Sequence, residues 1–115
     1  MELEYLCKIT ELNQNDIFSK HSNLFSKNII LIRRNGKLYA WLDACPHYEN
    51  GPAMALKKDQ YLSPDQQFLM CFGHGAKFDI TTGLCVHGPC LGKKLTPIYF
   101  EIISDEIFLY KETIK

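Results

Sequence analysis

Residues 71–79, CFGHGAKFD, place a thiol at Cys71 and an imidazole at His74, with a glycine directly after the histidine. A second such pair lies upstream at Cys45 and His47, and 23 residues separate His47 from Cys71. Thiolates and imidazoles are the side chains that bind iron, zinc and copper at neutral pH. Each half contributes one Cys and one His, which predicts a metal centre built by two loops.

The residues around the two pairs predict stiff loops that tolerate a bulky group. Pro46 fixes its own φ and pushes Cys45 toward an extended conformation, and Gly73 and Gly75 let the backbone approach a ligand closely. A single zinc with a Cys2His2 ligand set is one alternative, although common zinc patterns put both Cys in one loop and both His in the other. A binuclear iron–sulfur cluster explains mixed pairs better, since one iron can take both Cys and the other both His.

The order of the motifs resembles the Rieske [2Fe–2S] proteins. The resemblance rests on Cys45-Pro46-His47, Cys71 to Gly75, Phe78-Asp79, Thr82-Gly83 and Gly88-Pro89, in that order. It implies a mainly β fold, with an antiparallel β-sandwich base and an inserted, loop-rich cluster-binding subdomain at about 44–91. Residues 1–115 would then form a single Rieske domain.

The resemblance also implies roles for four ligands. Cys45 and Cys71 would hold the buried iron of one [2Fe–2S] cluster, and His47 and His74 would hold the outer iron. Gly88-Pro89 would cover a third side of the cluster. The family includes stand-alone ferredoxins, which suggests an electron carrier rather than an enzyme. It would pass electrons from a flavin- or NAD(P)H-dependent reductase to an oxygenase or another terminal oxidoreductase.

Two departures from the high-potential members of the family predict a low reduction potential. Those members join the two cluster loops by a disulfide, whereas this chain has no cysteine in residues 48–51 or at Phe72 and Gly73. They also place Ser and Tyr hydroxyls near the cluster, where this chain has Ala76 and Phe78. We therefore expect a potential nearer to about −150 mV than to about +300 mV.

A further Cys-x-His, Cys85-Val86-His87, is followed by Cys90 and could be mistaken for a ligand pair. We interpret these residues as parts of the covering loop and its approach, because they lack the Gly and Pro setting of the other pairs. Cys7 is expected to be a small buried residue, since no His or Cys stands near it. His21 lies in a polar segment and is expected to be exposed.

Alternation and turn signals predict an antiparallel β fold. The clearest signal is Asn35-Gly36 between the apolar runs 29–34 and 37–42, which predicts a hairpin. Further strands are expected at 4–10, with Tyr5, Cys7 and Ile9 on one face, and at 96–103 and 106–110, joined around Ser104-Asp105. Residues 11–27 are polar and irregular. Between the two metal loops we expect short strands at 60–62 and 67–70, a turn at 63–65, and at most one helical turn at 53–58.

Composition limits the functions that the chain can perform. At 115 residues it suits one domain. Because 13 basic residues balance 13 acidic ones, the chain has no excess of positive charge that would indicate a nucleic-acid partner. The longest aliphatic run, residues 29–32, is too short to span a membrane, and the N-terminus has no targeting signal. Five cysteines are an odd number, which disfavours a secreted disulfide framework and favours the cytoplasm.

Two other classes of function remain open at this stage. The chain could be an accessory subunit of a reductase, as in the nitrite reductase small subunits that share the fold, although those typically lack the four ligands. It could also be a zinc-stabilised binding module without a redox role. A ring-hydroxylating oxygenase would need a second domain with a 2-His-1-carboxylate iron site, for which no residues remain.

Overall fold

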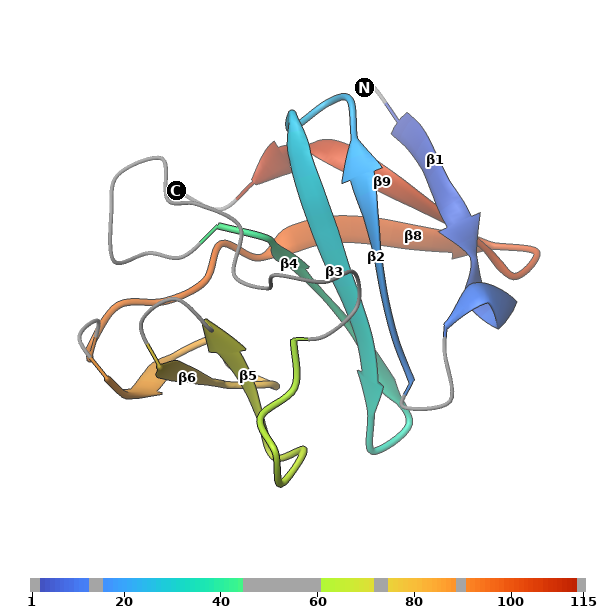
Figure 1. The fold of residues 1–115 in the computed structure, drawn as a ribbon. Helices are drawn as coiled ribbons and strands as arrows, with labels where there is room; N and C mark the ends of the chain where they lie inside the picture. Colours follow the sequence, from blue (N-terminus) through green and yellow to red (C-terminus); the bar gives the residue numbers. More distant parts are fainter. Residues whose placement is uncertain (1–2, 13–15, 45–60, 72–74, 89–90, 114–115) are drawn as a thin grey trace. The chain divides into compact units, whose positions relative to one another are not determined.

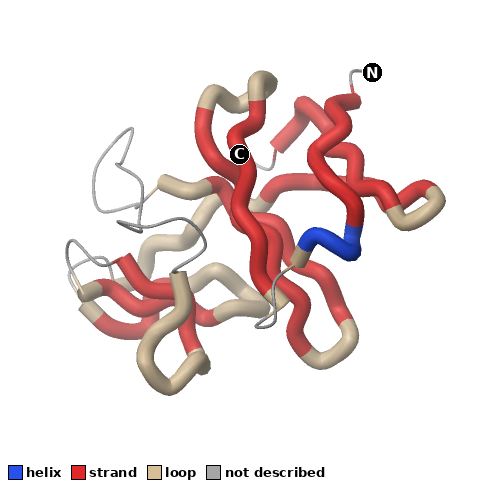
Figure 2. The backbone as a smooth tube through the Cα atoms, turned by 45° about the vertical axis from the view of Figure 1, so that its right-hand side comes forward, coloured by secondary structure: helices blue, strands red, loops and turns tan. Residues whose placement is uncertain are grey.

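The computed structural model describes residues 3–12, 16–44, 61–71, 75–88 and 91–113. They divide into two compact units, the base (1–42 with 96–115) and the inserted unit (43–95). In the described part of the chain the regular structure consists of antiparallel strands and one 3-10 helix, Ile9–Glu11 (Figures 1 and 2). The expected mainly β, antiparallel fold is therefore confirmed. No helix among these residues is long and apolar enough to cross a membrane.

The base contains two three-stranded sheets, with strand orders β1-β9-β8 and β2-β3-β4. Tight turns join β3 to β4 and β8 to β9, whereas β1 pairs with β9 from the opposite end of the sequence, and all of these pairs are antiparallel. Their strands are β1 (Leu3–Lys8), β2 (Ile17–Ser22), β3 (Lys27–Arg34), β4 (Lys37–Leu42), β8 (Ile98–Ile103) and β9 (Glu106–Thr113).

Two-residue turns set the register of both sheets. Asn35 and Gly36 have φ values of 54° and 79° and join β3 to β4, with Arg34 paired to Lys37. Positive φ at both positions is typical of the type I′ turn, which matches the twist of a hairpin. Ser104-Asp105 joins β8 to β9 in the same way, with φ values of 50° and 63°. Both hairpins were predicted from the sequence.

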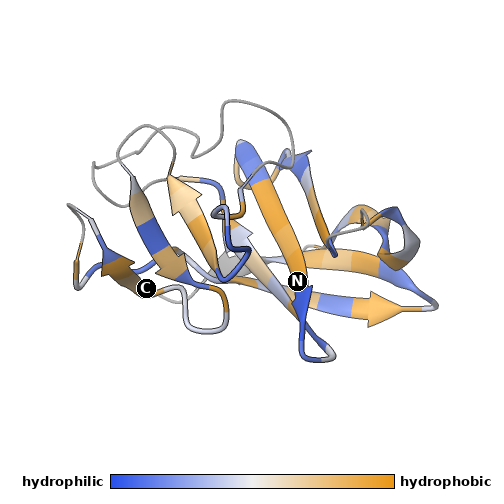
Figure 3. Ribbon diagram, turned by 60° about the horizontal axis from the view of Figure 1, so that its bottom comes forward, coloured by the Kyte–Doolittle hydropathy of each residue, from blue (hydrophilic) through white to orange (hydrophobic). Residues whose placement is uncertain are grey.

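The core of the base is an apolar layer to which both sheets contribute. β3 is buried on both faces, because the side chains of the run 29–32 are all fully buried. Most of the hydrophobic residues lie along the strands, and hydrophilic residues gather in the turns (Figure 3). The buried cluster consists of Leu6, Cys7, Ile29, Leu31, Ala40, Ile98, Ile107 and Leu109.

Two expectations for the base were wrong. In β1, Leu6 and Cys7 are both buried while Tyr5 is 43% exposed, because the pairing with β9 shifts register between Tyr5 and Cys7. Such a bulge adds one residue and breaks the simple alternation on which the predicted faces depended. The segment expected to be irregular contains β2, which pairs with β3 over its whole length. Its buried residues include Ser19 and Ser22, which hid the strand from an apolar pattern.

The inserted unit has one small sheet of order β5-β6-β7. Its strands are β5 (Phe68–Cys71), β6 (Ala76–Asp79) and β7 (Cys85–His87). β5 was predicted at 67–70, whereas β6 and β7 were not predicted. The possible helical turn at 53–58 lies outside the described residues.

Candidate metal centre

Cys71 is the last residue of β5, and its side chain is 1% exposed. Its backbone oxygen accepts a hydrogen bond of 2.7 Å from the amide of Gly75. Gly75 has a φ of 71°, a conformation that an L side chain rarely adopts. Cys71 is thus a buried residue at the end of β5, and its backbone is bonded to the residue that precedes β6.

The other three predicted ligands, Cys45, His47 and His74, lie outside the described residues. Within the described ranges, no group of three His, Cys, Asp or Glu side chains comes together as a metal site. The donor chemistry at Cys71 fits an iron–sulfur centre, because a buried thiol that is in no disulfide is a soft ligand for iron.

The backbone at Gly88 packs directly on β6. A Cβ atom at this position would lie 2.7 Å from the Cα of Ala76, which is closer than real Cβ atoms approach. Gly88 also has a φ of 104°. Both the space and the backbone conformation therefore require glycine. The segment that was predicted to cover the cluster is held tightly against β6 at this residue, whereas Pro89 and Cys90 lie outside the described part.

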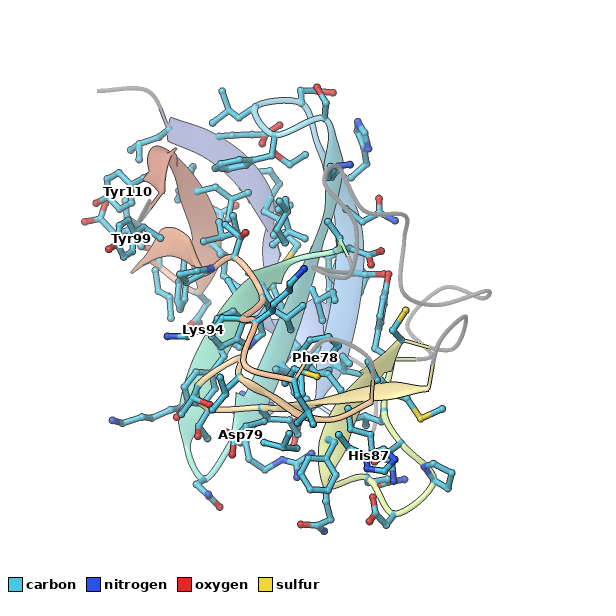
Figure 4. The ribbon with its side chains drawn as sticks, turned by 90° about the vertical axis from the view of Figure 1, so that its left-hand side faces the viewer. Phe78, Asp79, His87, Lys94, Tyr99 and Tyr110 are labelled. Atoms are coloured by element: carbon cyan, nitrogen blue, oxygen red, sulfur yellow. The ribbon has the colours of Figure 1, made fainter. Side chains whose placement is uncertain are left out.

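The two positions noted in the sequence for their lack of hydroxyls are apolar and fully buried. Ala76 and Phe78 are both 0% exposed and alternate along β6 with the less buried Lys77 and Asp79; Figure 4 labels Phe78 and Asp79. Neither side chain can donate a hydrogen bond. A hydroxyl at either position would stand in an environment where hydrogen bonds are strong and an unpaired polar group is costly.

The second Cys-x-His pair has its two side chains in different surroundings. Cys85 is 2% exposed and is paired in register with Phe78, and its thiol donates a hydrogen bond of 3.3 Å to the backbone oxygen of His87. The imidazole of His87 is exposed and its residue pairs with Lys77. The register of the β6–β7 pairing shifts between these two residue pairs. The side chain of Cys85 therefore packs in the interior, and the side chain of His87 faces solvent.

The two isolated residues of the base are placed as expected. Cys7 is fully buried, and burial raises the pKa of its thiol to about 11, with a further contribution from Glu11. A protonated thiol in an apolar core is a poor metal ligand and nucleophile. His21 is exposed on β2. Neither residue therefore belongs to the candidate centre.

The Thr82-Gly83 turn is held by Asp79. The carboxylate oxygen Oδ1 of Asp79 accepts hydrogen bonds from the hydroxyl of Thr81 at 2.7 Å and from the amides of Thr81 and Thr82 at 2.8 and 3.1 Å. The hydroxyl of Thr81 is the main reason that the pKa of Asp79 is lowered, and both amides act in the same direction. The Phe-Asp motif of the sequence thus supplies a buried ring and a turn-forming carboxylate from adjacent positions.

Sequence reasoning missed a buried polar pair in the inserted unit. The hydroxyl of Tyr61 donates a hydrogen bond of 2.7 Å to the carboxylate oxygen Oδ2 of Asp43. Asp43 is 3% exposed and Tyr61 is 2% exposed. The available signal was an acidic residue two positions before Cys45, directly after the apolar end of a strand.

Comparison with known proteins was made by sequence family and by structure. The sequence matches the family model described as Rieske [2Fe-2S] domain over residues 2–111. No curated protein gives a significant match. All of the solved structures described next are below 25% identical, so they establish similarity of fold.

One solved chain comes from a complex of reduced oxygenase and oxidised ferredoxin in carbazole 1,9a-dioxygenase, with a TM-score of 0.73 and 18% identity over 98% of this chain and 96% of that chain. Another is the ferredoxin of carbazole 1,9a-dioxygenase from Nocardioides aromaticivorans IC177, with a TM-score of 0.70 and 16% identity over 95% and 97%. The terminal oxygenase from the same organism matches with a TM-score of 0.74 and 16% identity, over 99% of this chain and 31% of that chain. The fold is thus found both as a ferredoxin and as part of a larger oxygenase chain.

Proposed function

Because the chain belongs to the Rieske [2Fe–2S] domain family, we propose that it is a one-electron carrier of the ferredoxin type. The observation that carries this proposal is the presence of all four donors, Cys45, His47, Cys71 and His74, within the family match over residues 2–111. The family implies one Rieske-type [2Fe–2S] cluster, and the buried thiol of Cys71 fits that cofactor.

Cys45 and Cys71 would hold one iron, and His47 and His74 the other. When bound, the cluster supplies one-electron oxidation and reduction at potentials set by its ligands and surroundings. Four protein ligands leave no open position for a substrate, which argues for electron transfer rather than catalysis by this chain alone. With one ring nitrogen bound to iron, the second ring nitrogen of each histidine would be available to donate a hydrogen bond or hold a proton.

The similarity of the fold to the ferredoxin of carbazole 1,9a-dioxygenase supports a role in which this chain passes electrons to a terminal oxygenase or another oxidoreductase. A flavin- or NAD(P)H-dependent reductase would supply the electrons. Tyr48 and Pro89, next to the ligands in the sequence, would contribute to a small docking face, since transient redox encounters bury less than about 1,200 Å². We place this exchange in the cytoplasm, because five cysteines and a cluster site suit a reducing compartment.

The reduction potential should lie at the low end of the Rieske range, nearer to about −150 mV than to about +300 mV. Support comes from Ala76 and Phe78, which are buried and carry no hydroxyl, and from the absence of cysteines that could form a disulfide between the cluster loops. A redox titration of the purified protein tests this value, and a clearly positive potential would contradict it.

The decisive experiment combines metal analysis with electron paramagnetic resonance of the dithionite-reduced protein. We expect two irons and two acid-labile sulfides per chain, and a spectrum typical of mixed Cys and His ligation. Zinc without sulfide would support a zinc-stabilised binding module instead. A protein without any metal would resemble the accessory reductase subunits. A spectrum typical of four thiolate ligands would contradict the ligand assignment.

A further inference from the structure

The Asp43–Tyr61 contact is a buried hydrogen bond between the two ends of the segment that contains the first pair of predicted ligands. Asp43 follows directly after the last residue of β4 and stands two positions before Cys45. Tyr61 lies 18 positions further along the chain. The 2.7 Å bond joins the hydroxyl of Tyr61 to Oδ2 of Asp43 inside the inserted unit.

Tyr61 is itself fixed to β5 by backbone hydrogen bonds. Its oxygen accepts a bond of 2.7 Å from the amide of Met70, and the amide of Ser63 donates one of 2.8 Å to the oxygen of Phe68. Leu62 pairs with Leu69 between them. Residues 61–63 and 68–70 therefore form a short antiparallel ladder, which ends one residue before Cys71.

A polar turn closes this ladder. The hydroxyl of Ser63, which is 2% exposed, donates to the carboxylate of Asp65 at 2.6 Å and accepts from the amide of Phe68 at 3.2 Å. The same carboxylate accepts from the amide of Gln67 at 3.1 Å. Because the turn is held at several points, the ring of Tyr61 has a fixed position relative to β5.

We infer that Asp43 and Tyr61 are positioning residues, which fix the start of the first ligand loop at a set distance from the strand that carries Cys71. The inference rests on the proposed function and deepens it. One path of contacts runs from Asp43 through the phenol of Tyr61 to the backbone of Met70, and so to Cys71. Cys45 is two residues from one end of this path, and Cys71 is the residue after the other.

Physical chemistry explains why such a contact matters at this place. Ligands of a metal site must be held within about 0.5 Å of their productive positions by surrounding hydrogen bonds and packing. A buried carboxylate costs free energy unless hydrogen-bond donors satisfy it, so removal of one donor is expensive. The Asp43–Tyr61 contact therefore favours a single arrangement of the loop start before any cofactor binds.

The first test replaces Tyr61→Phe, which removes the hydroxyl and keeps the buried ring. The matched control is Tyr99→Phe, which removes a hydroxyl from a tyrosine of β8 that is 44% exposed in the base. We expect Y61F to lose iron to a chelator about tenfold faster than wild type, as the loss of one buried hydrogen bond implies. We also expect broadened lines in the electron paramagnetic resonance spectrum of reduced Y61F, and no change in the spectrum of Y99F.

The second test uses the partner of the bond. Asp43→Asn keeps an oxygen that can accept from Tyr61, whereas Asp43→Ala does not. We expect D43N to retain iron nearly as long as wild type and D43A to lose it as fast as Y61F. The double variant D43A/Y61F should lose less than the sum of the two single variants, because the two substitutions remove one shared contact. Additive losses, or equal losses in D43N and D43A, would overturn the inference.

A third measurement does not depend on the cofactor. Amide hydrogen exchange at Ala44 and at residues 61–63 should be about tenfold faster in Y61F than in Y99F, in protein as purified and after removal of metal. Unchanged exchange would refute the positioning role, whatever metal the protein holds. Wild-type protein with no iron and sulfide would refute the proposed function alone. An iron–sulfur protein with identical spectra and iron loss in Y61F and Y99F would refute the positioning role alone.

Discussion

The base and the inserted unit are both antiparallel β structures, but different interactions stabilise them. Strands of the base are six to eight residues long and share one apolar core. Strands of the inserted unit have three or four residues, and side chains such as Asp65, Asp79 and Ser63 bind the backbone of its turns. Burial of apolar area can hold the base, whereas the inserted unit combines buried side chains such as Leu69, Phe78 and Leu95 with individual polar contacts and, we propose, its cofactor.

The largest effect should follow from Cys71→Ser. Serine cannot replace the soft thiolate ligand, so we expect complete loss of the cluster and of its spectrum. Hydrogen exchange should rise across residues 61–88 and remain slow in β3, because the base has its own core. Cys85→Ser is the matched control, since Cys85 is equally buried. Its cluster spectrum should stay intact, and a lost spectrum in C85S would reassign that thiol as a ligand.

Leu31→Ala should produce the opposite pattern. Leu31 is fully buried in the apolar core of the base, and truncation of such a residue costs about 2–5 kcal/mol. Chemical denaturation of the protein should show this loss of unfolding free energy. The spectrum of the cluster in the native protein should not change, because Leu31 lies outside the inserted unit. A normal stability of L31A would show that the core is not what holds the base.

Gly88→Ala should destabilise the inserted unit by about 3 kcal/mol, through a clash with the Ala76 backbone and through strain at positive φ. Gly92→Ala is the control, because Gly92 also has a positive φ but has open space around it. We expect G92A to cost only about 1–2 kcal/mol. Iron retention and thermal unfolding measure both variants, and equal effects would mean that backbone strain alone explains Gly88.

Asp79→Ala should have the smallest effect, about 1 kcal/mol, because Asp79 is partly exposed and the bond from the amide of Gly83 to the backbone oxygen of residue 79 also holds the turn. The pKa of Asp79 is lowered in the folded protein, mainly by the hydroxyl of Thr81. Its contribution is therefore present above the ordinary pKa of 3.8 and is lost as the pH falls through the lower folded value. The difference between wild type and D79A should be constant near neutral pH and should disappear in acid. A difference that grows in acid would contradict this account.

The sequence predicted the base well where tight turns and apolar runs coincide. Asn35-Gly36 and Ser104-Asp105 are both turns with positive φ, and the strands that they join have the expected positions. It failed at β1, where one extra residue at the bulge reverses the faces, and at β2, whose buried positions include serines. Bulges and buried hydroxyls depend on tertiary partners, so periodicity along the chain does not reveal them.

For the candidate centre, the sequence identified residue types but not the contacts that arrange them. Cys71 was predicted as a ligand and is buried at a strand end, although the complete ligand set is still a prediction. The link between Asp43 and Tyr61 could not be predicted, because the two residues are 18 positions apart and neither belongs to a recognised motif. Such long-range polar pairs become visible only when the strands are placed in space.

The close approach of Gly88 to Ala76 has a consequence for how this sequence can evolve. Gly36 and Gly92 have positive φ values but open space, so asparagine can replace glycine there at a lower cost than other residues. At Gly88 every side chain would meet the backbone of β6, which cannot move aside as a flexible side chain can. Among relatives that keep the four ligands, the first two positions should therefore vary between glycine and asparagine. Position 88 should remain glycine wherever the backbone at position 76 lies as close to it as in this protein.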